Sequence, residues 1–229
     1  MTATATEPWT TARHPLARLL RSVASGALPE ADGQWARVSP WVPAIQAVVA
    51  FTGHTILAVS YDVSDDTLVD LGVDGVGGAF SARTVTALAG PTGWIGAPQV
   101  LHVALGTGAG QTGALSARSD LSRHPAVATA RRTLQDVQVL AAGAPEHEDV
   151  VVLGRGVAGV REICVQTALP GDPRAGGLAH QALGSVPENE IVLLCVPAYD
   201  ARGLMAAAEA GFRPVGGVQL FSTRPEHKL

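Results

Sequence analysis

Residues 161–179 read REICVQTALPGDPRAGGLA, a strand, a loop and a helix start in direct succession. The apolar and β-branched side chains from Val160 to Thr167 predict the strand. Residues 169–174 contain two prolines and a glycine, which are turn-forming residues, and so predict the loop. The spacing of apolar residues predicts a helix from Gly176 to Ser185.

The segments that follow extend this pattern to the C-terminus. Glu190 to Val196 is typical of a buried strand, Asp200 to Ala210 of a helix and Pro214 to Phe221 of a last strand. Gly211 stands where a glycine commonly ends a helix. Because a helix connects the strand Val160–Thr167 to the strand Glu190–Val196, we expect these two strands to be parallel neighbours. The predicted fold class is α/β, with a mixed central sheet flanked by helices.

The N-terminal half also alternates helices and strands, with a loop expected from Leu28 to Pro43. The residue patterns predict helices at Pro15–Ala24, after Ser64, after Ser81 and at Pro125–Thr133, and strands at Gln46–Thr52, Thr55–Ser60, Val100–Leu105 and Leu134–Leu140. A polar break at residues 141–149 is the best candidate boundary. It separates an N-terminal α/β half at residues 13–145 from a C-terminal part at residues 146–229. The N-terminus is rich in threonine and alanine, so we expect residues 1–12 to form a disordered tail.

Composition narrows the class of protein. Of the 229 residues, 47% are hydrophobic and 16% charged, and the net charge is −4. No uncharged apolar run reaches the roughly 18 residues of a membrane helix, so we expect a soluble, cytoplasmic protein. The richest basic cluster, Arg13, Arg18 and Arg21, is interpreted as a solvated helix face, which argues against a nucleic-acid partner. Cys164 and Cys195 lack metal-ligand spacing and are expected to be buried, reduced thiols.

The start of the helix after the loop has the chemistry of a phosphate site. A helix N-terminus carries unpaired N–H groups and the positive end of the helix dipole. Gly176 and Gly177 would let a phosphate approach the backbone, and Arg174 adds a cation. The alternative is an ordinary glycine-rich loop.

Arg174-x-x-Gly177-x-Ala179 fits the Q/R-x-x-G-x-G/A signature of the GNAT acyltransferase superfamily, and residues 210–216, AGFRPVG, resemble its closing turn. The resemblance covers about residues 150–221 and extends to an actinobacterial type with an N-terminal extension. It implies binding of acetyl-CoA or another acyl-CoA. The pantetheine arm would lie between two splayed strands and pair with backbone near Val165. The implied pyrophosphate site comprises Arg174, Ala175, Gly176, Gly177, Leu178 and Ala179.

The resemblance also suggests catalytic residues. Glu162 lies where several family members carry a general base for an attacking amine, although it could instead be a strand-end residue paired with Arg161 or Arg155. Asp200 replaces an asparagine common in the family and could simply cap its helix. His54 could be a second acid–base group or a structural residue.

One departure from the family affects the expected reaction. Ala207 stands where the family often has a tyrosine that assists the thiolate leaving group. The leading prediction is an N-acyltransferase, with acetyl transfer to a small-molecule amine. The alternatives are other acyl-CoA chemistry, such as decarboxylation or condensation, and a non-catalytic ligand-binding protein. We expect neither a metal, a membrane nor nucleic acid as a partner, and a homodimer stays open.

Overall fold

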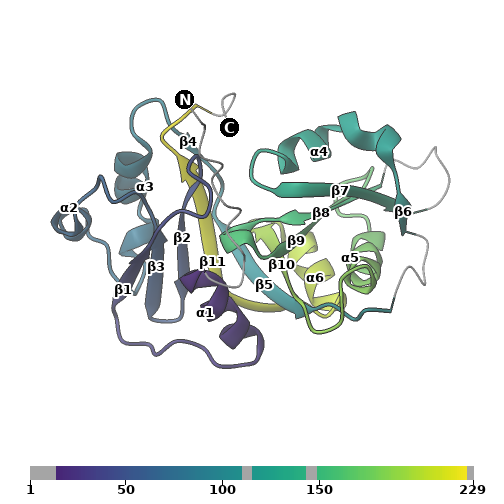
Figure 1. Ribbon diagram of the computed structural model, residues 1–229, viewed down its shortest axis with the longest axis horizontal. Coiled ribbons are helices and arrows are strands. Elements are labelled where there is room, and N and C mark those ends of the chain that lie inside the picture. The colour runs from purple at the N-terminus through teal and green to yellow at the C-terminus, as the bar shows by residue number, and fades with distance from the viewer. Residues whose placement is uncertain (1–13, 110–114, 143–148, 226–229) are drawn as a thin grey trace, which may run out of the picture.

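The computed structural model describes residues 14–109, 115–142 and 149–225. Its centre is a mixed sheet of eleven strands in the order β1-β3-β2-β11-β5-β10-β9-β8-β7-β6, with β4 paired to β11 (Figure 1). The strands are β1 (Trp35–Val38), β2 (Gln46–Phe51), β3 (His54–Ala58), β4 (Trp94–Ile95), β5 (Gln99–Leu105), β6 (Leu115–Ala117), β7 (Gln135–Ala142), β8 (Val150–Arg155), β9 (Arg161–Gln166), β10 (Ile191–Pro197) and β11 (Arg213–Ser222). The predicted fold class is therefore confirmed.

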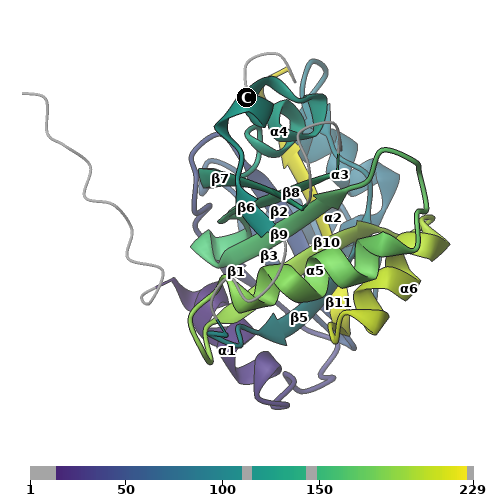
Figure 2. The ribbon, with the colours of Figure 1, turned by 90° about the vertical axis from the view of Figure 1, so that its right-hand side faces the viewer.

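Helices cover both faces of this sheet. The α-helices are α1 (Pro15–Ala24), α2 (Asp65–Asp70), α3 (Ala82–Ala89), α4 (Pro125–Ala130), α5 (Arg174–Gly184) and α6 (Ala201–Glu209). Helices α1 and α4 pack on one face, where Val49 and Val152 contribute to their cores. Helices α2, α3, α5 and α6 pack on the opposite face, where the preceding residues of the same strands, Val48 and Val151, contribute to their cores. Figure 2 shows α5 and α6 side by side across β9 and β10. The alternation follows from the two-residue period of a strand.

Local sequence accounts for most helix boundaries. Helix α1 begins with Pro15 in its first turn, and the His14 side chain accepts a hydrogen bond from the Leu16 N–H. Ser64 and Ser81 accept hydrogen bonds from backbone N–H groups in the first turns of α2 and α3, as the sequence predicts. Gly211 has a φ of 90°, the left-handed conformation expected after α6.

The predicted loop from Leu28 to Pro43 is partly wrong, because it contains β1. This strand pairs in parallel with β3, with Trp35 opposite Thr55. It has only four residues and lies at the edge of the sheet. Short edge strands depend on their neighbour for stability, so little in the local pattern reveals them.

The sheet is continuous across the expected boundary at residue 146. Strand β5, from the first half of the chain, lies between β10 and β11, and β7 pairs with β8. The two halves therefore share one sheet. Residues 143–148 and the predicted tail at residues 1–12 lie outside the described residues. Among the described helices, none is both long and apolar enough to span a membrane.

Candidate functional site

A gap between β9 and β10 organises the candidate site. These parallel strands pair only at Arg161 with Val192 and at Glu162 with Leu193. Further along, β9 stays paired to β8 up to Gln166, and β10 stays paired to β5 up to Pro197. Beyond the Glu162–Leu193 pair, β9 and β10 are therefore hydrogen-bonded only to β8 and β5, respectively, and no longer to each other. The predicted parallel, splayed pair is confirmed.

Cavities open on both faces of the sheet at this gap. The α4 cavity, about 520 Å³, lies beside α4 and contacts Glu162. The α6 cavity, about 140 Å³, lies between β10, α5 and α6. Both are lined by Cys164, Val165 and Cys195. The gap therefore lies between two cavities on opposite sides of the sheet, an arrangement that would let two ligands meet there.

Glu162 is buried at the closed end of the gap. Its side chain accepts a hydrogen bond from the Val157 N–H at 3.3 Å, and a second from the Cys195 thiol. The turn after β8 wraps the carboxylate so closely that a Cβ on Gly156 would lie 1.7 Å from Oε2. Gly156 is therefore required for this approach. The alternative ion pair with Arg161 or Arg155 is not formed, since the hydrogen bonds of Glu162 come from other groups.

Burial gives the site unusual protonation states. Loss of solvation raises the pKa of Glu162 to about 7, despite the hydrogen bonds that oppose this shift. Burial also raises the pKa of Cys164 and of Cys195 far above their usual range, and the neighbouring Glu162 carboxylate adds to both shifts. Near neutral pH, Glu162 is therefore a carboxyl group that can accept or release a proton, whereas both cysteines stay neutral thiols.

The start of α5 differs from a bare phosphate site. Arg174 lies 2.7 Å from Asp149, which is buried, and 2.7 Å from Asp172. The Asp172 carboxylate also accepts a hydrogen bond from the Arg174 N–H, and the Asp172 backbone carbonyl accepts one from the Ala175 N–H. The hydrogen-bonded Arg174 lowers the pKa of Asp172. The predicted cation is present, but its charge is already balanced by two carboxylates.

The two glycines of α5 have different surroundings. A Cβ on Gly176 would lie 2.9 Å from the Glu209 carboxylate and 3.2 Å from the Ala206 carbonyl oxygen, so this glycine allows α5 to pack against α6. Gly177 faces open space, with no atom within 4 Å of such a Cβ. Leu178 is buried in the core. Of these two glycines, only Gly177 has open space beside it.

Asp200 and Ala207 border the α6 cavity, together with Ala175 and Ala179. Asp200 caps α6, since its Oδ1 accepts a hydrogen bond from the Gly203 N–H at 2.9 Å. The capping role considered from the sequence is thus observed. Ala207 is buried, and its small side chain borders the cavity.

His54 lies away from this group. It begins β3, which is separated from β10 by β2, β11 and β5. Its Nδ1 lies 2.9 Å from Asp32, and it lines neither the α4 nor the α6 cavity. The structure does not bring His54 to Glu162, because four strands lie between β3 and β9 in the sheet.

Sequence reasoning missed several residues of the α4 cavity. His124, interpreted only as a helix entry, does accept a hydrogen bond from the Ala126 N–H but also lines this cavity. Gln99 and Gln166 reach the cavity from β5 and β9. They come from distant parts of the chain and share no motif, so only the sheet order could reveal them.

Comparisons with known proteins are sparse. No protein-family model and no curated protein matches the sequence. The matching solved structures include a conserved protein of unknown function from Staphylococcus epidermidis, with 14% identity, a TM-score of 0.38 and coverage of 58% of this chain and 63% of that one. Another is a candidate acetyltransferase of the GNAT family from Novosphingobium aromaticivorans, with 17% identity, a TM-score of 0.37 and coverage of 58% and 68%. The chain thus spans less than two thirds of the first of these structures.

Proposed function

We propose that the protein is an acyl-CoA-dependent N-acyltransferase that acetylates a small-molecule amine. The observation that carries this proposal is the position of Glu162. This carboxyl group has a pKa of about 7 and lies at a gap lined from both faces of the sheet. A general base works best when its pKa is close to the working pH.

The splayed strands supply a place for acyl-CoA. The inner ladder ends after Glu162 and Leu193, which leaves the facing backbone edges of β9 and β10 beyond that pair available to the amides of a pantetheine arm. Val165 lies on this part of β9 and borders both cavities. The phosphates would lie at the start of α5, beside the open face of Gly177. When bound, acyl-CoA supplies an activated thioester carbonyl.

The α4 cavity indicates the class of acceptor. Its described lining offers hydroxyl, amide and imidazole groups from Thr129, Gln166 and His124, and one acidic group, Glu162. No described arginine or lysine lines it, so the described lining offers no permanent positive charge to an acidic substrate. We therefore favour an amine without a carboxylate or phosphate. Glu162 would take the proton that the amine loses as it attacks.

A second candidate is a ligand-binding protein without acyl-transfer activity. It is favoured by Arg174, whose charge is balanced by Asp149 and Asp172, and by Ala207 at the position where the family often has tyrosine. Other acyl-CoA chemistry, such as decarboxylation or condensation, would use the same gap and the same base.

The deciding experiment combines binding with turnover. We expect acetyl-CoA to bind in a calorimetric titration, and release of free CoA thiol in the presence of a panel of primary amines. Binding without thiol release for any amine would favour the ligand-binding candidate. Absence of binding at millimolar acetyl-CoA would contradict every acyl-CoA candidate.

A further inference from the structure

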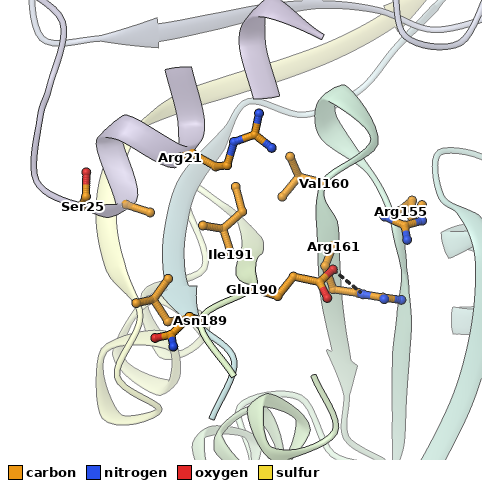
Figure 3. Close-up of a pocket in the computed structure, with 10 residues that line it drawn as sticks. Arg21, Ser25, Arg155, Val160, Arg161, Asn189, Glu190 and Ile191 are labelled. Atoms are coloured by element: carbon orange, nitrogen blue, oxygen red, sulfur yellow. Dashed lines mark hydrogen bonds and ion pairs between the residues drawn. The ribbon is translucent and has the colours of Figure 1, made fainter. Parts of the chain in front are cut away.

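A third cavity lies at the other end of β9 and β10, where these strands are paired. This α1 cavity has a volume of about 520 Å³ and is bordered by the end of α1, the turn before β9 and the residues before β10 (Figure 3). Its lining comprises Arg21, Ala24, Ser25, Leu105, Arg155, Val160, Arg161, Asn189, Glu190 and Ile191. It shares none of these residues with the α4 or α6 cavities.

Three arginines border this cavity. Arg155 and Arg161 are direct partners in the antiparallel pair of β8 and β9, and Figure 3 shows the Arg161 side chain extending toward Arg155. Arg21 reaches from α1 toward the turn at Val160 in the same view. Like charges directly opposite each other on antiparallel strands are unfavourable. This end of the sheet therefore gathers positive charge at a cost in stability.

Two carboxylates lie beside these arginines. Glu190 lies 3.4 Å from Arg161 and is the one acidic residue among the described lining residues. Asp136 lies 3.5 Å from Arg155, but its side chain is 75% exposed and outside the lining. A 3.5 Å contact at the protein surface contributes little. The lining thus carries three formal positive charges against one negative charge.

Apart from the charged residues and the polar Ser25 and Asn189, the rest of the lining is apolar. Ala24 lies at the end of α1, Leu105 at the end of β5, and Val160 and Ile191 beside the paired strands. The cavity therefore combines a cationic side with an aliphatic side. Guanidinium groups bind carboxylates and phosphates through paired hydrogen bonds, and aliphatic walls accept a hydrocarbon chain.

We propose that the α1 cavity binds a small anion with a short aliphatic chain, with its acidic end on Arg155 and Arg161 and its chain on Val160 and Ile191. Because this cavity and the gap share no lining residue, the site does not depend on acyl transfer.

Hexyl phosphate is a suitable probe, with inorganic phosphate and hexanol as its two halves. We expect calorimetry to give a Kd at or below the millimolar range for hexyl phosphate, and at least tenfold weaker binding of either half alone. Raising the salt concentration should weaken binding, because the attraction is electrostatic. Equal affinity for inorganic phosphate would contradict the aliphatic part of the site, and no binding at millimolar hexyl phosphate would overturn the proposal.

Opposite charge changes within the lining test the placement. Arg161→Gln should weaken the binding of hexyl phosphate by about tenfold or more, since charge-assisted hydrogen bonds are lost. Glu190→Gln should instead tighten it several-fold, because Arg161 loses a competing carboxylate. Arg18→Gln, on the exposed side of α1, removes the same charge outside the cavity and should leave affinity unchanged.

The gain expected for Glu190→Gln separates binding from folding, because a misfolded variant would not bind more tightly. Thermal unfolding of each variant provides a parallel check of the fold. If Arg161→Gln does not fold, Arg155→Gln replaces it, with the same expected loss. Unchanged affinity in Glu190→Gln and in the folded arginine variant would place the anion elsewhere and overturn the proposal.

Discussion

The two ends of the β9–β10 pair offer opposite environments within a few residues. At the paired end, Arg161 and Glu190 form an ion pair and border an open cavity. Where the strands begin to splay, Glu162 is buried and its pKa is raised to about 7. Arg161 and Glu162 are adjacent in the chain. The contrast teaches that solvation, which the strand geometry decides, sets the chemistry of each side chain more than its type does.

The largest expected effect tests whether the splayed end is catalytic. If the protein is an acyltransferase, Glu162→Gln should lower kcat roughly 100-fold or more, the usual contribution of a positioned general base. The wild-type pH–rate profile should rise through about pH 7, where Glu162 loses its proton, and the variant should lose this step. Glu188→Gln, an exposed residue beyond the lining of the cavities, is the matched control. Equal profiles for wild type and Glu162→Gln would remove the assigned base.

The second prediction concerns stability rather than activity. The folded pKa of Glu162 is about 7 against an ordinary value of 4.5, so the folded state binds this proton more tightly than the unfolded state. The contribution of Glu162 is fully present below pH 4.5 and is lost as pH rises through 7, by about 3 kcal/mol. Glu162→Gln should lack this loss. Chemical unfolding at several pH values would measure it, and parallel curves for both proteins would argue against the raised pKa.

The third prediction tests how closely the turn after β8 holds the carboxylate. Gly156→Ala would place a Cβ 1.7 Å from Glu162 Oε2, so either the turn or the carboxylate must move. We expect a loss of about 1–3 kcal/mol in the free energy of unfolding, as for other overpacked interiors. Gly177→Ala, where the added Cβ meets no atom within 4 Å, is the control and should be neutral or stabilising. An equal response of both variants would mean that the close approach is unimportant.

The smallest expected effects test the start of α5, where the two carboxylates compete with any phosphate. Gly177→Val adds bulk on the open face of the helix and should weaken the binding of CoA by about tenfold without loss of stability. Asp172→Asn should strengthen CoA binding modestly, because it removes a negative charge beside the phosphates. Calorimetry on both variants checks these opposite signs. If neither changes affinity, CoA binds at another place.

Sequence patterns were most informative where a structure depends on nearby residues. The boundaries of α1 follow from Pro15 and from leucines at helical spacing, and the end of α6 follows from Gly211. The parallel pairing of β9 and β10 also follows locally, because the connecting helix requires a crossover. The ion pair of Arg174 could not be predicted in this way, because its partner Asp149 lies 25 residues earlier in the chain, just before β8.

By itself, the sequence determined the α/β class and the strand–helix–strand unit, because helix caps, periodicity and crossover rules act over a few residues. Only the resemblance to the GNAT superfamily suggested Glu162 as a candidate base. Tertiary structure alone decided that β5 enters between β10 and β11, that His124 faces the same cavity as Glu162, and that His54 does not. It also gathered Arg21, Arg155 and Arg161 around one cavity. Burial and the distances between charges depend on which distant segments pack together, and these set protonation and binding.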